Sequence, residues 1–319
     1  MSLKNIKGQD RPIRILKGYL KSEDIQGAYL FTGEEGIGKL LAAENLAKAL
    51  NCLNEGEDSC DHCPSCIKID KRAHPDVHLI GLDSDTIKID SIRVLKKEIG
   101  LRPYEAKKKV FIVNNAHNLG SEAAGAILKV LEEPPRDSVI ILVTAKPALL
   151  FKTIISRCKI IKFSPLKRTE LKEILKQDYS LNDDTAHFLA YFCEGRIGYA
   201  LKLKETDILK EKNEIIDLFT IFNNSGIENT RLQNRENLRS QLNILTSWFR
   251  DIYLIKTGTA HSELINFDRK AELLKHMNRY TLFDVDEIIK SISDSMLFLE
   301  QNVNVKLLLS NLKAEIWRN

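Results

Sequence analysis

Residues 28–50 read AYLFTGEEGIGKLLAAENLAKAL, and the architecture of the chain follows from this stretch. A short apolar run at 28–31 leads through a glycine-rich turn into an Ala- and Leu-rich segment at 40–50 that is typical of a helix. Strand, glycine turn and helix in this order form the setting of a phosphate-binding loop, because the N–H groups of the turn and the helix N-terminus attract an anion. The stretch therefore predicts an α/β domain with a phosphate loop.

The turn matches the pattern G-x-x-x-x-G-K, which begins at Gly33 and ends with Gly38 and Lys39. We expect Gly33, Gly36 and Gly38 to let the backbone curl around phosphates, and Lys39 to reach the β and γ oxygens. The next position normally carries Ser or Thr, whose hydroxyl holds Mg²⁺, but here it is Leu40. A glycine turn without a ligand is the alternative, and the sequence leaves open whether a nucleotide is retained.

Four cysteines follow this helix, and their spacing is that of a metal site: Cys52, Cys60, Cys63 and Cys66. Two overlapping C-x-x-C pairs with a fourth cysteine nearby suit a tetrahedral Zn²⁺ held by four thiolates. Such a closed site is structural, since it stabilises a short segment that is too small to bury a hydrophobic core of its own. The sequence thus predicts a zinc module at 52–66, with four free cysteines in a loop as the alternative.

The run at 110–113, VFIV, is typical of a buried parallel strand. In an active P-loop ATPase such a strand ends in acidic residues that support Mg²⁺ and polarise the attacking water. Here it ends in Asn114 and Asn115, and neither side chain is an anion or a general base. Together with Leu40, these two residues predict that ATP hydrolysis has been lost.

Composition restricts the class of protein. The chain has 319 residues, of which 43% are hydrophobic and 29% charged, as expected for a globular protein with a real core. Its net charge of +4 is too small to indicate a nucleic-acid partner by itself. The segment 1–11 lacks the apolar core of a signal peptide, and no apolar run is long enough for a membrane span. Clustered cysteines favour metal binding in a reducing compartment, so we expect a cytoplasmic protein.

The pattern along the chain changes at Pro165. Strand and helix segments alternate from 10 to 165, which predicts an α/β layer with a parallel sheet in a first domain, 1–165. Three helical segments follow at 166–206, and long helical periods fill 207–319. The apolar stripes of this last domain either pack only on each other or also contact a partner.

Several motifs together resemble the clamp-loader subunits of bacterial DNA polymerase III, which are AAA+ proteins. The resemblance spans most of the first 200 residues, and no motif of the C-terminal third contributes to it. The motifs are the loop 33–39, the four cysteines, the His-Pro-Asp at 74–76, the run AILKVLEEPP at 126–135, and Ser156-Arg157-Cys158. The resemblance implies that 166–206 is a helical lid and 207–319 an oligomerisation collar.

Within this family, the departures from the pattern favour the delta-prime type of subunit over the ATPase type, gamma or tau. The ATPase type has Thr or Ser at position 40, an Asp-Glu pair at 114–115 and a sensing arginine in a Gly-Ser-x-Arg pattern. The matching stretch here is Gly195-Arg196-Ile197-Gly198, so glycine stands where that arginine falls and Arg196 is displaced. An active gamma/tau-type ATPase is the alternative.

The resemblance also implies a mechanism. The loader is a hetero-pentamer with gamma/tau and delta subunits, which opens the sliding clamp and places it on primed DNA, driven by ATP at subunit interfaces. Arg157 is then an arginine finger in trans, whereas without the resemblance it is a surface arginine on a β-edge. Two other hypotheses stay open: a self-sufficient AAA+ ATPase with an atypical site, and a zinc-stapled nucleic-acid-binding module.

Overall fold

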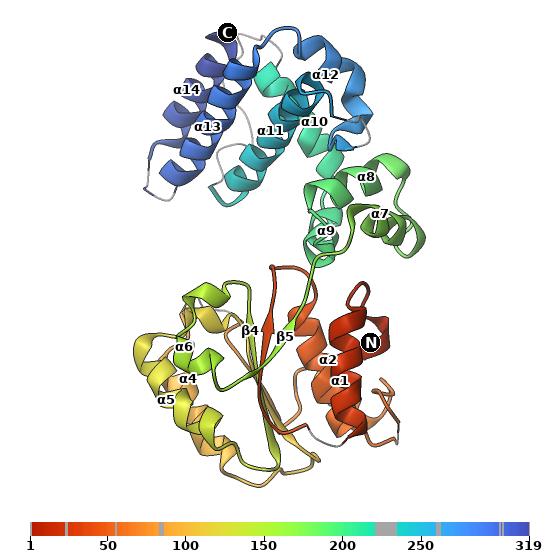
Figure 1. Ribbon diagram of the computed structural model, residues 1–319, viewed down its shortest axis with the longest axis vertical. Coiled ribbons are helices and arrows are strands. Elements are labelled where there is room, and N and C mark those ends of the chain that lie inside the picture. Colours follow the sequence, from red (N-terminus) through yellow and green to blue (C-terminus); the bar gives the residue numbers. More distant parts are fainter. Residues whose placement is uncertain are drawn as a thin grey trace. The chain divides into compact units, whose positions relative to one another are not determined.

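A computed structural model describes residues 2–22, 25–54, 56–82, 86–220, 235–259, 263–299, 301 and 303–318. The chain forms two compact units (Figure 1). The first comprises Met1–Leu166 together with Arg196–Tyr199, and the second comprises Lys167–Gly195 together with Ala200–Asn319. The finer division into a lid at 166–206 and a collar at 207–319 stays a prediction.

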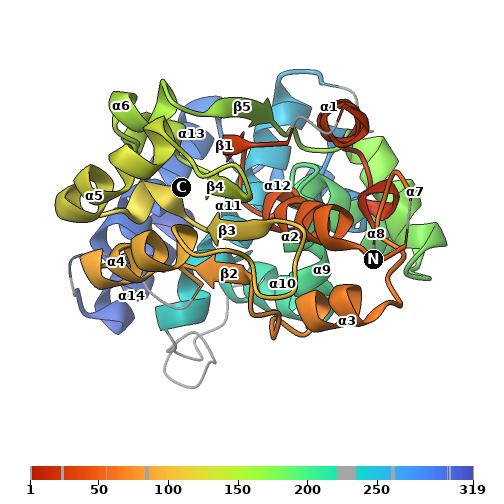
Figure 2. The same cartoon turned by 90° about the horizontal axis from the view of Figure 1, so that it is seen from below.

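The first unit contains a sheet of five parallel strands. These are β1 (Gly27–Thr32), β2 (Val77–Ile80), β3 (Lys109–Val113), β4 (Ser138–Thr144) and β5 (Lys159–Lys162). Their spatial order is β2-β3-β4-β1-β5 (Figure 2). Every residue of β3 and β4 is buried, as expected for inner strands covered on both faces. The predicted α/β domain with a parallel sheet is confirmed.

Helices cover both faces of this sheet (Figure 1). The helices of the first unit are α1 (Asp10–Lys21), α2 (Lys39–Asn51), α3 (Pro64–Asp70), α4 (Ile89–Ile99), α5 (Ser121–Glu132) and α6 (Lys152–Ile155), with short 3-10 turns at Leu3–Asn5, Ala116–Asn118 and Pro147–Leu149. Side chains alternate along β1, so Tyr29 and Phe31 join the core under α1 and α2. Leu30 joins the other core, under α4, α5 and α6.

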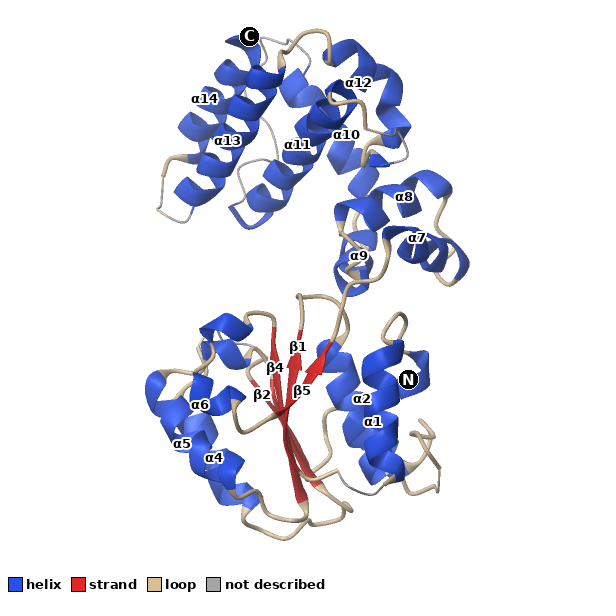
Figure 3. Ribbon diagram, viewed as in Figure 1, coloured by secondary structure: helices blue, strands red, loops and turns tan. Residues whose placement is uncertain are grey.

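The second unit is helical throughout its described part (Figure 3). Its helices are α7 (Arg168–Gln177), α8 (Asp183–Phe192), α9 (Ile197–Lys204, whose first residues belong to the first unit), α10 (Ile208–Thr220), α11 (Arg235–Lys256), α12 (Lys270–His276), α13 (Leu282–Leu299) and α14 (Val305–Arg318), with a 3-10 turn at Phe267–Arg269. Trp248 and Phe249 of α11 lie fully buried in its core. No described helix combines the length and the apolar character that a bilayer span requires.

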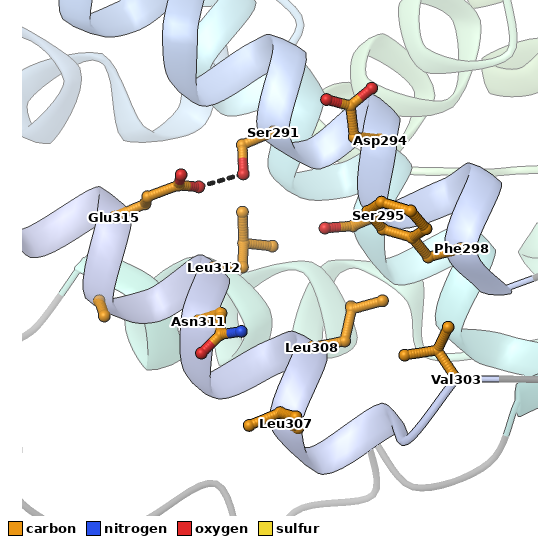
Figure 4. Close-up of a pocket in the computed structure, with 11 residues that line it drawn as sticks. Ser291, Asp294, Ser295, Phe298, Val303, Leu307, Leu308, Asn311, Leu312 and Glu315 are labelled. Carbon is orange, nitrogen blue, oxygen red and sulfur yellow. Dashed lines mark hydrogen bonds between the residues drawn. The ribbon is translucent and has the colours of Figure 1, made fainter.

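A groove of about 660 Å³ lies between α13 and α14 (Figure 4). Its floor is apolar and includes Leu308 and Leu312, while Ser291 and Glu315 are hydrogen-bonded to each other at one end. Phe298 and Leu307 line the groove and are 47% and 60% exposed. Large apolar side chains of α13 and α14 are therefore left open to solvent.

Candidate functional site

The glycine loop between β1 and α2 has the backbone of a phosphate loop. Gly33, Gly36 and Gly38 have φ angles of +141°, +78° and +94°, which side chains disfavour. A Cβ at Gly33 would also lie only 2.5 Å from the carbonyl oxygen of Phe163. Helix α2 begins directly after the loop, at Lys39, so its first N–H groups are next to the turn.

Lys39 is only 6% exposed, and its Nζ donates a hydrogen bond to the carbonyl oxygen of Glu34 inside the loop. Burial lowers the pKa of Lys39 to about 8, although Glu35 and Glu34 oppose the shift. A buried ammonium on a glycine loop is suited to an anion, since a bound phosphate would restore the charge balance that burial disturbs.

Leu40 occupies the position at which a hydroxyl would hold Mg²⁺. Its side chain is half-buried and packs against the core between the sheet and the helices α1 and α2. It presents no oxygen atom, and Mg²⁺ requires oxygen ligands. The loop thus has the glycines and the lysine of a phosphate loop and lacks this metal ligand.

The carboxyl ends of β3 and β4 lie beside that of β1, because adjacent parallel strands end at the same edge of the sheet. Asn114 donates its backbone N–H to the carbonyl oxygen of Ile80 at 2.8 Å, and Asn115 adopts a left-handed backbone with φ of +50°. Nδ1 of His117 lies 3.1 Å from Oγ1 of Thr144. Burial, together with nearby Lys146, lowers the pKa of His117, which favours the neutral ring.

Sequence reasoning did not single out His117 or Thr144 as residues of this edge. The available signal was that each follows or ends a predicted buried strand, so that both belong at the same edge as the glycine loop.

The first turn of α9 contacts the glycine loop through backbone atoms. The N–H of Gly198 donates to the carbonyl oxygen of Gly36 at 2.6 Å, and a Cβ at position 198 would lie 2.8 Å from that oxygen. Nε of Arg196 lies 3.9 Å from a carboxylate oxygen of Glu34. The first turn of α9 therefore contacts the glycine loop through a glycine, Gly198.

The four predicted cysteine ligands come together, with all four sulfur atoms within 4.8 Å of one another. Cys52, Cys63 and Cys66 are buried and Cys60 is half-buried, and none forms a disulfide. Tetrahedral Zn–S bonds of about 2.3 Å place sulfurs about 3.8 Å apart, so this spacing fits a metal ion. N–H groups of Cys60, Cys63 and Cys66 point at cluster sulfurs across 3.3–3.5 Å, which is suited to thiolate charge.

A buried lysine anchors the cysteine module, and sequence reasoning did not identify it. Lys48 of α2 is fully buried, and its Nζ lies 2.6 Å from Asp61 and 2.9 Å from Asp70. Asp61 lies between two of the cysteines, while Asp70 ends α3. In addition, Nζ of Lys107 donates to the carbonyl oxygen of Cys52 at 2.8 Å. The module is thus attached to the α/β core at both of its ends.

Asp76 of the His-Pro-Asp motif holds the segment that leads into β3. Its carboxylate accepts backbone N–H groups from Tyr104, Glu105 and Ala106 at 2.8, 2.8 and 2.9 Å. Burial by itself raises the pKa of Asp76, but these three hydrogen bonds outweigh it and the pKa is lowered. Nδ1 of His74 accepts the N–H of Asp76 at 3.1 Å. The motif therefore has a structural role in this unit.

Arg157 lies just after α6 and is hydrogen-bonded within its own chain. Its Nε donates to Oε1 of Glu132 at 2.8 Å, its Nη2 donates to the same oxygen, and its Nη1 donates to the carbonyl oxygen of Thr153 at 2.9 Å. The neighbouring thiol of Cys158 is half-buried, which raises its pKa to about 12. Within the described part of the chain, Arg157 makes no hydrogen bond or ion pair with the glycine loop.

A glycine loop with a buried lysine, on a parallel sheet of order β2-β3-β4-β1-β5 and followed by a helical unit, defines a P-loop protein of the AAA+ class. Comparison with known proteins identifies the family. Residues 8–167 match the family described as "DNA polymerase III, delta subunit", and residues 209–315 match "DNA polymerase III, delta subunit, C terminal". The chain belongs to the DNA polymerase III delta-subunit family.

Several individual proteins are also similar to this chain. The chain is 30% identical over 315 residues to the DNA polymerase III subunit delta' of Bacillus subtilis, covering 95% of this chain and 94% of that protein. It is 32% identical over 201 residues to the gamma/tau subunit of Mycoplasma pneumoniae, covering 61% of this chain and 29% of that protein. A solved gamma subunit-related protein of Thermotoga maritima covers 96% of this chain, with 18% identity and a TM-score of 0.48.

Proposed function

We propose that this chain is the delta-prime subunit of a DNA polymerase III clamp loader, a stator that does not hydrolyse ATP and completes the ATP site of a neighbouring gamma/tau subunit. The observation that carries the proposal is the composition of the glycine-loop edge. It keeps the phosphate-binding backbone and Lys39, whereas Leu40, Asn114 and Asn115 replace the hydroxyl and the carboxylates that hydrolysis requires.

The missing groups affect both the metal and the nucleophile. Leu40 is packed against the core and offers Mg²⁺ no ligand. An amide at position 114 or 115 is a poor Mg²⁺ ligand and cannot polarise a water molecule as a carboxylate does. The loop then binds a nucleotide weakly at most, because its lysine and backbone N–H groups act without the metal that normally bridges the β and γ phosphates.

Arg157 is the group that this subunit contributes to catalysis in the assembly. Its side chain is 33% exposed, and its planar cationic guanidinium is suited to phosphate oxygens. Arginine fingers supplied in trans stabilise the charge of the transferring phosphoryl group and accelerate hydrolysis by about 10³–10⁵-fold. The gamma/tau subunit is the recipient, within a hetero-pentamer that also contains delta and acts on the sliding clamp and primer-template DNA.

The cysteine cluster is a structural zinc site formed by Cys52, Cys60, Cys63 and Cys66. Zn²⁺ bound there supplies a closed four-coordinate crosslink, and no catalytic step is assigned to it. The buried Lys48 stabilises the same module through ion pairs with Asp61 and Asp70.

The C-terminal helices form the collar through which the subunit assembles. Support comes from the groove between α13 and α14, which is lined by the exposed side chains of Phe298 and Leu307 (Figure 4). Leu297 of α13 is exposed as well. Contiguous exposed apolar side chains mark surfaces that bind other proteins. This favours contact with a partner over packing within the domain alone.

The test is steady-state ATP hydrolysis by a loader reconstituted with gamma/tau and delta subunits. We expect no turnover by the isolated chain and a loss of at least two orders of magnitude in the assembly carrying Arg157→Ala. Arg102→Ala, at an exposed arginine of the same unit, is the matched control and should leave the rate unchanged. Turnover by the isolated chain that is lost on Lys39→Ala would instead identify an active gamma/tau-type ATPase.

A further inference from the structure

The two most specific motifs of the chain, LEEPP and Ser-Arg-Cys, meet in one pair of side chains. Glu132 is the last residue of α5, and Arg157 follows α6. A carboxylate at the C-terminal end of a helix is disfavoured by the helix dipole. Its position is explained here by the guanidinium of Arg157, which donates to Oε1 of Glu132 through both Nε and Nη2.

The guanidinium is held from two sides. Glu132 binds the Nε–Nη2 edge, while Nη1 is bound to the carbonyl oxygen of Thr153 at 2.9 Å and lies 3.4 Å from Oγ of Ser156. All three nitrogens of the guanidinium therefore donate within the chain. These contacts leave one N–H of Nη2 unused, and the side chain as a whole is still 33% exposed.

We propose that Glu132 is a positioning residue for Arg157, an inference that rests on the function proposed above. An arginine side chain has many rotamers. Fixing one of them when a partner binds costs conformational entropy, which weakens binding. An anchor within the same chain orders the guanidinium beforehand and leaves one N–H of Nη2 that these contacts do not use, which can donate to a phosphate oxygen of the neighbouring subunit. Glu132 itself contacts no nucleotide and acts only through Arg157.

The next residue, Glu133, provides a matched control. It has the same side chain, is exposed, and belongs to the same motif, but the contacts of the described residues do not connect it with Arg157. Any general effect of removing one negative charge from this end of α5 should therefore be the same at both positions.

The experiment measures kcat and KM for ATP in the reconstituted loader with Glu132→Gln, Glu133→Gln, Arg157→Ala and the double variant Glu132→Gln/Arg157→Ala. We expect Glu132→Gln to lower kcat by about three- to tenfold with KM unchanged, because an amide cannot neutralise the guanidinium and holds it less firmly. Glu133→Gln should leave kcat within about twofold. The double variant should be no slower than Arg157→Ala alone, as required for a residue that acts through Arg157.

The outcomes separate the two proposals. If Arg157→Ala slows the loader while Glu132→Gln leaves kcat unchanged or raises it, Arg157 still acts in trans and the positioning role of Glu132 is wrong. A further loss in the double variant, or an equal loss with Glu133→Gln, overturns the positioning role in the same way. An unchanged rate with Arg157→Ala removes the proposed function itself. Glu132→Asp, which keeps the charge with a shorter reach, should lie between wild type and Glu132→Gln, so the test does not depend on one variant being well folded.

Discussion

The backbone N–H of Gly198 donates to the carbonyl oxygen of Gly36 at 2.6 Å, which joins the first turn of α9 to the glycine loop. A Cβ at position 198 would lie 2.8 Å from that oxygen. A larger side chain at this position would require the loop or the turn to move. Glycine therefore allows a backbone contact that other residues would exclude.

Gly198→Ala is expected to destabilise the chain by about 1–3 kcal/mol, the usual cost of inserting a methyl group into a packed contact. Gly125→Ala is the control, since position 125 is exposed in α5 and a Cβ there meets nothing within 4 Å. That change should stabilise the chain by about 0.5–1 kcal/mol, because glycine weakens a helix interior. Urea unfolding at pH 7 measures both, and an unaltered stability of Gly198→Ala would contradict the close approach.

The zinc proposal predicts about one equivalent of Zn²⁺ per chain when the protein is purified without chelator. Cys66→Ser should retain less than about half an equivalent and unfold at a lower temperature, because a structural zinc site contributes its binding energy to folding. Cys158→Ser removes a thiol outside the cluster and should keep the full equivalent. Elemental analysis checks the metal content. A wild-type protein with negligible zinc and an unchanged melting temperature in chelator would argue against a metal role for the cluster.

Asp76→Asn is expected to cost about 1–3 kcal/mol at pH 7, since a buried acceptor of three backbone N–H groups is weakened. The pKa of Asp76 is lowered in the folded state, so its contribution is fully present above the unfolded pKa of about 3.9 and is lost as pH falls through the lower folded value. The stability gap between wild type and variant should thus be constant from pH 7 to about pH 5 and close in stronger acid.

Chemical denaturation across this pH range measures the gap. Asp90→Asn is the control, because Asp90 lies on the surface with its side chain 79% exposed, and it should change stability by less than about 0.5 kcal/mol. A gap that widens on acidification would have the wrong sign for a lowered pKa.

Local patterns were sufficient to predict the parallel sheet, the glycine loop and the cysteine cluster. Each depends on residues close in sequence, such as Gly33 to Lys39, whose spacing restricts the backbone directly. The pairing of Glu132 with Arg157 joins residues 25 positions apart. The buried Lys48 likewise forms ion pairs with Asp61 and Asp70, which lie outside its own helix. One sequence contains no signal for such pairs, because a charged residue near a helix end or on a helix face is usually solvated.

Leu40→Thr tests which residues block hydrolysis. A hydroxyl at this position supplies the missing Mg²⁺ ligand, so calorimetry should show ATP bound several-fold more tightly with Mg²⁺ than with EDTA. Leu41→Thr, at the exposed neighbouring residue, should show no such dependence. Hydrolysis by the isolated Leu40→Thr chain should nevertheless stay at background, because Asn114 and Asn115 still provide no carboxylate for the metal or the water. Turnover by Leu40→Thr alone would mean that the asparagines are not the obstacle, and that a single side chain separates this protein from an active gamma/tau-type ATPase.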